Sequence, residues 1–282
     1  VGDDCAILGL RDGERLAVSV DTLVAGVHFL ADNFPEDIGF KAVSVAASDL
    51  AAMGARPVGM TIALTLPEPD ELWLQTFSQG VSAAVSAYQL PLVGGDTTRG
   101  PLAISVQVMG ALPVDQALLR SGAQVGDDVY VSGTLGDAAA GLALEAGEWQ
   151  PDPDSAEYVL QRLNRPLARI ELGRALLGQA TAAIDISDGL LVDAGHIANA
   201  SGVGIEIEHE LLPLSPVLAA EPDRQKALRW ALTGGDDYEL CYCLPGGTRP
   251  REGTLVGRVV SGQGVTCGLE VSGQRGYEHF AI

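Results

Sequence analysis

Apolar residues at alternating positions or in short unbroken runs predict four strands in the first part of the chain. The strand over 15–24 places Ser19 and Asp21 on one face and Val18 and Val20 on the other. The other three strands are expected over 57–67, 90–95 and 102–112. Helical spacing predicts two helices, one over 38–54 that ends at a glycine and one over 69–88 that opens at a Pro-Asp pair.

The second part of the chain alternates short strands with longer helices. A strand over 129–132 leads through a glycine-rich turn into an alanine-rich helix, and a strand over 203–210 follows further along. Residues 181–202 have a strand–turn–helix pattern in which Ser187 or Asp188 is the expected N-cap. The order of elements predicts an α/β (α+β) fold with two domains, residues 1–112 and residues 113–282.

Composition narrows the possible partners. The chain has 282 residues, a net charge of −20 and 47% hydrophobic residues. Such a negative charge argues against nucleic acid as a partner, because its phosphates would be repelled. No apolar run approaches the roughly 18 residues of a membrane span. The two lysines, Lys41 and Lys226, do not follow a glycine-rich turn, so a P-loop is absent and any nucleotide chemistry must proceed without its lysine.

The four cysteines show neither a C-x-x-C pair nor zinc-ligand spacing. Cys241 and Cys243 lie two residues apart in a predicted strand and therefore share one face. We expect buried, reduced thiols in a cytoplasmic protein.

Carboxylates recur at one kind of position, at the end of a buried strand or at a glycine turn. They are Asp4, Asp21, Asp96, Asp185, Asp188 and Asp236, and Asp49 lies inside a predicted helix. Two bare carboxylates about 4 Å apart repel by about 4 kcal/mol at an effective dielectric near 20, so converging ones need cations. Oxygen ligands favour Mg²⁺, Ca²⁺ or Mn²⁺. Each aspartate taken singly is also compatible with a turn or helix cap.

The stretch "GGDTTRG" over 94–100 predicts a bare backbone turn that carries an anion and a cation. Arg99 and Arg120 are candidate phosphate contacts because a guanidinium grips phosphate oxygens with two donors, although an ordinary surface salt bridge is equally compatible. Among the four histidines, His28 stands out because it follows the strand that carries Asp21.

A series of motifs resembles bacterial thiamine-monophosphate kinases, within the superfamily of aminoimidazole-ribonucleotide and selenophosphate synthetases. In chain order the motifs are "GDDCAIL", "VSVDTLVAGVHF", "KAVSVAASDLAAMGARP", "LVGGDTTRGP", "RSGAQVGD", "IDISDGL", "LTGGDDYEL" and "GYEHF". They run from residue 2 to residue 280. The resemblance implies two α/β domains, a homodimer formed through the N-terminal sheet, and ATP-dependent conversion of thiamine monophosphate to thiamine diphosphate in the cytoplasm.

The resemblance also implies the roles of individual residues. Several Mg²⁺ ions would be held by Asp4, Ser19, Val20 through its main-chain carbonyl, Asp21, Asp49, Asp96, Asp185 and Asp188. ATP, the co-substrate, would contact Gly95, Asp96, Arg120 and Ser187. The thiamine phosphate would contact His28, Asp236 and Tyr277. No general base or covalent nucleophile is expected, because the acceptor phosphate is mostly dianionic at pH 7.

Two alternatives stay open at this point. Another member of the same superfamily would act on a different acceptor; a selenophosphate synthetase carries a reactive Cys with a Lys nearby, and Cys5 has no such neighbour. A non-catalytic acidic module for divalent cations would bind metal without turning over ATP.

Overall fold

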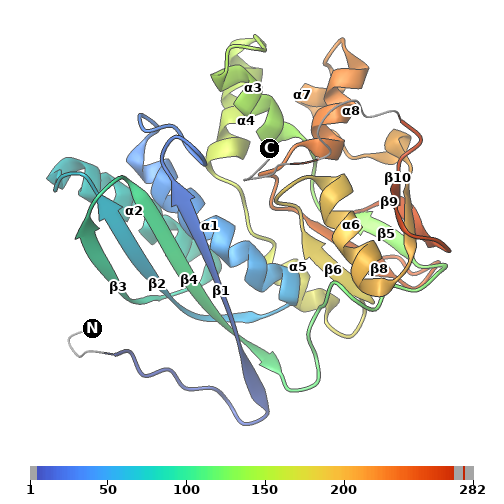
Figure 1. The fold of residues 1–282 in the computed structure, drawn as a ribbon, viewed down its shortest axis with the longest axis horizontal. Helices are drawn as coiled ribbons and strands as arrows, with labels where there is room; N and C mark the ends of the chain where they lie inside the picture. Colours follow the sequence, from blue (N-terminus) through green and yellow to red (C-terminus); the bar gives the residue numbers. More distant parts are fainter. Residues whose placement is uncertain (1–4, 270–275, 277–282) are drawn as a thin grey trace.

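The computed structural model of the protein describes residues 5–269 and residue 276, and its secondary structure forms two sheets with helices packed on them (Figure 1). The first sheet has the strand order β1-β4-β2-β3, from β1 (Glu14–Val24), β4 (Ala103–Pro113), β2 (Arg56–Leu66) and β3 (Leu92–Arg99). β4 pairs antiparallel with both β1 and β2, and β3 pairs parallel with β2. β1 and β3 are therefore the two edge strands.

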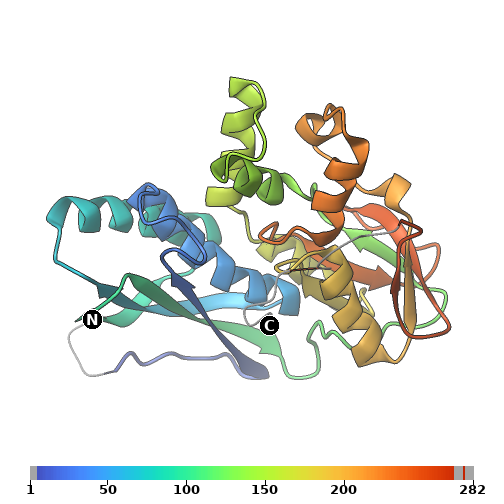
Figure 2. The same cartoon turned by 45° about the horizontal axis from the view of Figure 1, so that its top comes forward.

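Two helices cover one face of the first sheet and leave the other face open (Figures 1 and 2). They are α1 (Pro35–Met53) and α2 (Glu71–Tyr88). α2 begins after the predicted Pro-Asp pair, and the Asp70 side chain caps it by accepting a hydrogen bond from the Trp73 N–H at 3.0 Å. α1 is buried along most of its length because it packs against the sheet, against α2 and against α5 and β6 of the second half.

The second sheet has six strands in the order β10-β7-β9-β5-β8-β6. Their bounds are β5 (Asp128–Val131), β6 (Ala182–Asp185), β7 (Gly204–Ile207), β8 (Leu240–Leu244), β9 (Thr254–Val260) and β10 (Gly264–Thr266). The helices of this half are α3 (Asp137–Glu145), α4 (Pro153–Asn164), α5 (Ile170–Leu176), α6 (Leu190–Ser201), α7 (Pro216–Ala219) and α8 (Arg224–Thr233), with a 3-10 turn, η1 (His209–Leu211). The predicted α/β class is confirmed.

Two local predictions are wrong. The stretch 94–100 is not a turn, because its first six residues belong to β3, whose edge position leaves most of its side chains exposed. Neither Ser187 nor Asp188 caps α6. Gly189 occupies the N-cap without a side-chain bond, and Asp193 inside the helix reaches back to the preceding turn.

Cys241 and Cys243 on β8 are buried free thiols, as expected, and Cys267 is buried too, whereas Cys5 is exposed, contrary to the expectation. Among the residues that the structure describes, no helix is both long enough and apolar enough to span a bilayer.

Candidate functional site

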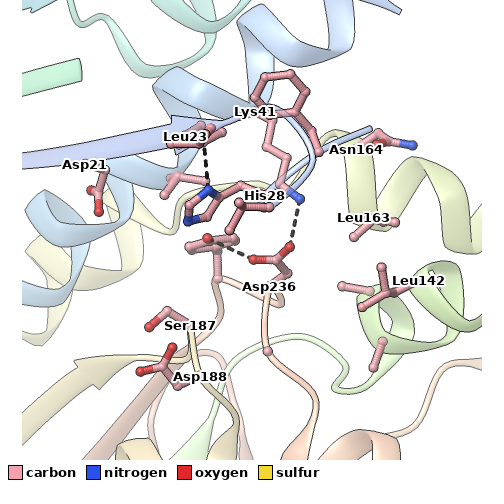
Figure 3. Close-up of a pocket in the computed structure, with 18 of the residues that line it drawn as sticks. Asp21, Leu23, His28, Lys41, Leu142, Leu163, Asn164, Ser187, Asp188 and Asp236 are labelled. Atoms are coloured by element: carbon pink, nitrogen blue, oxygen red, sulfur yellow. Dashed lines mark hydrogen bonds and ion pairs between the residues drawn. The ribbon is translucent and has the colours of Figure 1, made fainter. Parts of the chain in front are cut away.

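A cavity of about 830 Å³ lies where the two halves of the chain meet. Its wall is built from β1 and the loop that follows it, from α1, from α3 and the end of α4, and from two loops around residues 187–188 and 233–236. Figure 3 shows His28, Lys41 and Asp236 pointing toward one another, with Ser187 and Asp188 nearby. The cavity therefore collects polar side chains from segments that are far apart in the sequence.

Three carboxylates lie together beside this cavity, and each comes from a different element. Asp21 is on the inner face of β1, Asp49 is on α1, and Asp185 ends β6. The Ser19 hydroxyl donates to Asp49 Oδ2 at 2.5 Å, and the Ser48 hydroxyl donates to Asp185 Oδ2 at 2.7 Å. The packing of α1 between β1 and β6 thus creates the cluster.

The electrostatics of the cluster favour a bound cation. Burial, followed by the like charges of Asp49 and Asp185, raises the pKa of Asp21 to about 7. Burial and the charge of Asp49 raise the pKa of Asp185 to about 6. A divalent cation would remove the repulsion that produces part of these shifts, and the donors are oxygen atoms, the type that Mg²⁺ prefers.

Nevertheless, within residues 5–269 and 276 no three His, Cys, Asp or Glu side chains converge closely enough to hold a metal ion. The donor set fits a hard cation in its chemistry, while further ligands must complete the shell. Asp4, one of the predicted ligands, lies outside the described residues.

The turn that carries Ser187 and Asp188 is held by Asp193. The buried carboxylate of Asp193 accepts hydrogen bonds from the N–H groups of Ser187, Asp188 and Gly189, each at 3.1 Å. Burial and then the charge of Asp185 raise the pKa of Asp193 to about 7. Both predicted residues of this turn line the cavity.

A second loop, residues 234–238, is bonded to this turn. The Asp236 N–H donates to the main-chain carbonyl oxygen of Ser187 at 2.9 Å, and the Tyr238 N–H donates to that of Ile186 at 2.9 Å. A side chain at Gly235 would collide with the Ser187 oxygen, so the close approach requires glycine there. The two loops consequently form one rigid wall of the cavity.

His28 lines the opposite side of the cavity, in the loop after β1. The Val24 N–H donates to His28 Nδ1 at 3.0 Å. Nδ1 is therefore an acceptor, so the neutral ring carries its proton on Nε2. The arrangement makes His28 a hydrogen-bond donor for a ligand in the cavity.

The predicted residues on β3 lie away from this cluster. Asp96 pairs in register with Ala63, Ala63 with Ser105, and Ser105 with Thr22. Three strand spacings of about 4.8 Å separate the rows of Asp96 and Thr22, or roughly 14 Å. Asp96 also faces the open side of the sheet, as Thr22 does, whereas Asp21 faces α1. One chain thus does not bring Asp96 to Asp21.

The remaining predicted residues have mixed positions. Arg120 is exposed in the loop before β5, and its positive charge opposes the rise in the pKa of Asp185 that burial causes, which places it near the carboxylate cluster. Gly95 and Arg99 lie on β3; a side chain at Gly95 would collide with the Ile62 oxygen. Tyr277 lies outside the described residues, although its neighbour Gly276 lines the cavity.

Three residues of the site region escaped the sequence analysis. Lys41 pairs with Asp236, and Asp193 holds the 187–189 turn. Glu239 is fully buried and accepts two hydrogen bonds from Arg169, both at 2.6 Å, next to the 234–238 loop. An acidic residue in the first turn of a predicted helix was the available signal for Asp193. Lys41 and Glu239 offered none, because their partners are distant in sequence.

Comparisons with known proteins agree over most of the chain. The AIR synthase related protein family matches residues 2–112 by its N-terminal domain and residues 124–240 by its C-terminal domain. The thiamine-monophosphate kinase of Salmonella typhimurium (strain LT2) is 46% identical over 299 residues, which cover 100% of this chain and 91% of that protein.

Solved structures give the same result. The thiamine-monophosphate kinase from Stenotrophomonas maltophilia K279a has a TM-score of 0.90 and 44% identity, and the match covers 95% of this chain and 89% of that one. AaThiL complexed with AMPPCP and TMP has a TM-score of 0.89 and 39% identity, and the match covers 99% of this chain and 92% of that one.

Proposed function

The chain belongs to the AIR synthase related family and, within it, to the thiamine-monophosphate kinases, and on this premise we propose that it transfers the γ-phosphoryl group of ATP to thiamine monophosphate. The products are thiamine diphosphate and ADP. The observation that carries the proposal is that Asp21, His28, Ser187, Asp188 and Asp236 line one cavity. Because ATP is the co-substrate, we place the reaction in the cytoplasm.

The acceptor shapes what the site has to do. Its phosphate has a second pKa of about 6, so it is mostly dianionic at pH 7 and needs no base to become a nucleophile. The obstacle is repulsion between two polyanions, and catalysis then depends on positioning and on neutralising charge. The protein's task is to hold both phosphates at fixed distances within the cavity.

Different residues of the site would bind the metal, ATP and the thiamine phosphate. Asp21, Asp49, Asp185 and Asp188, with Ser19 and the Val20 carbonyl, would hold Mg²⁺. When bound, Mg²⁺ neutralises phosphate charge. The bonded loops 185–189 and 234–238 keep the metal side and the substrate side of the cavity at a fixed separation. Ser187 and Arg120 would contact ATP, and His28, Asp236 and Tyr277 would contact the thiamine phosphate.

A panel of acceptors tests the proposed function. With ATP and Mg²⁺ in excess, thiamine monophosphate should be phosphorylated, whereas unphosphorylated thiamine and aminoimidazole ribonucleotide should not accelerate ADP formation. Equal ADP formation with every acceptor, or with none, would contradict the proposal and favour another role within the same fold.

His28→Ala is expected to raise the KM for thiamine monophosphate by about tenfold, the size of a lost hydrogen bond to a charged group, and to change the KM for ATP by less than about twofold. The reason is that His28 lies across the cavity from the Ser187 turn, with Nε2 as its donor. Steady-state kinetics with each substrate varied in turn measures both constants. An equal rise in both would assign His28 a structural role.

The open face of the first sheet supports a homodimer. Leu16, Val18 and Val20 of β1 point away from α1 and are 48%, 52% and 59% exposed. A row of exposed apolar side chains on a sheet face without a covering layer is typical of a protein–protein contact. We propose that two copies pack these faces together about a two-fold axis.

Val18→Asp is expected to convert the dimer to monomer at micromolar concentration, because the dimer would bury an unpaired carboxylate, at a cost of several kcal/mol. Sedimentation velocity measures the change. Leu72→Asp is the matched control, because Leu72 is 72% exposed on α2 and lies on the other side of the sheet. A monomeric wild-type protein, or a Val18→Asp variant that remains dimeric, would contradict the interface.

The proposed dimer would also explain how Asp96, which is distant from Asp21 within one chain, reaches a metal site. β1 and β3 are opposite edges of the sheet, and a two-fold axis parallel to the strands sets β3 of one subunit against β1 of the other. Asp96 of one subunit would then approach Val20 and Asp21 of the second. We propose that each metal site is completed in this way.

A further inference from the structure

Lys41 occupies an unusual position for a lysine. It lies in the middle of α1, its side chain is only 4% exposed, and its ammonium contacts Asp236 Oδ2 at 2.8 Å (Figure 3). The two residues are 195 positions apart, so the ion pair joins the first half of the chain to the second. The described residues that line the cavity also include the acidic residues Asp21, Glu145 and Asp188, and Lys41 adds a positive charge to this lining.

The loop that Lys41 contacts has an unfavourable backbone. Asp236 and Tyr238 have φ angles of +64° and +49°, values that residues with side chains rarely adopt. Such conformations persist where surrounding contacts hold them, and they cluster at functional sites. Here the Tyr238 hydroxyl donates to Asp236 Oδ1 at 3.1 Å, while Lys41 donates to Oδ2. Both carboxylate oxygens are thereby fixed.

The Lys41 and Asp236 side chains differ in solvent exposure, and this difference indicates what the ion pair does. The Asp236 side chain is 37% exposed, so water could solvate its charge without Lys41. The Lys41 ammonium, in contrast, depends on Asp236, because a buried charge without a partner is costly. Replacing a buried ion pair by apolar side chains is often neutral or stabilising, so stability alone does not account for a lysine at this position. What the pair provides is a fixed orientation of the Asp236 carboxylate.

We propose that Lys41 is a positioning residue that fixes the Asp236 carboxylate toward the bound thiamine monophosphate. The inference rests on the proposed function. Asp236, a proposed substrate contact in the second half of the chain, is thus oriented by a residue of the first half, and Lys41 acts through Asp236 without itself touching the reacting atoms.

Lys41→Met tests the proposal, because it removes the charge, keeps the length of the side chain and leaves a half-exposed Asp236 that water can solvate. We expect the KM for thiamine monophosphate to rise about tenfold, with kcat and the KM for ATP changed by less than about twofold. Lys226→Met is the matched control. Lys226 also forms an ion pair, with Glu221 at 3.1 Å, but does not line the cavity. It should leave all three constants unchanged.

A double-mutant comparison separates action through Asp236 from independent action. Lys41→Met combined with Asp236→Asn should raise the KM no further than Asp236→Asn alone, because the two residues would act as one unit. The proposal would be overturned if the rise in KM of the double variant equalled the product of the rises in the two single variants. It would also be overturned if Lys41→Met left the KM unchanged. Thermal unfolding of each variant checks that the loss is not a loss of fold.

Two further measurements keep the inference distinct from the proposed function. With only two lysines, a protein labelled with ¹⁵N-lysine gives two ammonium signals, and Asp236→Asn should shift the Lys41 signal alone. Calorimetry should show thiamine monophosphate binding about tenfold more weakly to Lys41→Met than to wild type. Equal binding, or no binding to wild type, overturns the Lys41 proposal. A wild type that binds thiamine monophosphate but makes no thiamine diphosphate refutes only the kinase reaction.

Discussion

Asp49→Asn is expected to lower the turnover of thiamine monophosphate by roughly a thousandfold or more, the loss typical of a removed charge-stabilising group at a reacting phosphate. Asp49 lies between β1 and β6. Burial raises the pKa values of Asp21 and Asp185 most, and the charge of Asp49 raises both of them further. A neutral amide is a poor Mg²⁺ ligand, so the proposed metal site would lose one of its carboxylates.

The fold should survive this substitution. The Ser19 hydroxyl, which donates to Asp49 Oδ2, can donate to an amide oxygen in the same place. Loss of one negative charge also relieves repulsion, so the melting temperature without metal should not fall. Asp37→Asn, on the same helix but outside the cavity, is the matched control and should retain activity. Retained activity in Asp49→Asn would remove Asp49 from the metal site.

Asp96→Asn is expected to abolish turnover as well, and a mixture of the Asp96→Asn and Asp49→Asn proteins should recover activity. The reason is the register of the first sheet, which sets Asp96 three strands away from β1 and on its other face. If each site combines Asp49 of one subunit with Asp96 of the other, a mixed dimer contains one site with both aspartates intact.

The size of the recovery follows from simple counting. Random exchange of two variants makes about half of the dimers mixed, and each of these has one working site of two, so about a quarter of wild-type activity should return. Subunits can be exchanged by co-expression with two affinity tags or by refolding the variants together. Activity that stays at the level of the separate variants would show that Asp49 and Asp96 do not complement each other across a dimer.

Local sequence patterns predicted much of the fold. Alternating apolar residues identified the strand of Asp21, and helical spacing placed Asp49 inside a helix, where the structure has it on α1. The Pro69-Asp70 pair marked the start of the second helix, which the structure places at Glu71 with Asp70 as its cap. The stretch over 94–100 failed because its glycines suggested a turn, whereas pairing with β2 makes it a strand. Strand pairing is a tertiary contact that local propensity does not contain.

The site itself was only partly accessible. Family motifs brought His28, Ser187 and Asp236 into consideration, and the structure places all three in one cavity. Lys41 looked like one more residue in a helix with apolar neighbours, because its partner is far away in the chain. Likewise, the register that separates Asp96 from Asp21 becomes visible only when the strand order is known.

Phosphorus-31 NMR of the complete reaction follows phosphoryl transfer from ATP to thiamine monophosphate itself, and it is the measurement that we would make first. With wild-type protein and Mg²⁺, we expect the β-phosphorus signal of thiamine diphosphate and the signals of ADP to grow in equal amounts. Both should stop when the metal is chelated. Release of inorganic phosphate from ATP while the thiamine monophosphate signal stays constant would show that thiamine monophosphate is not the acceptor.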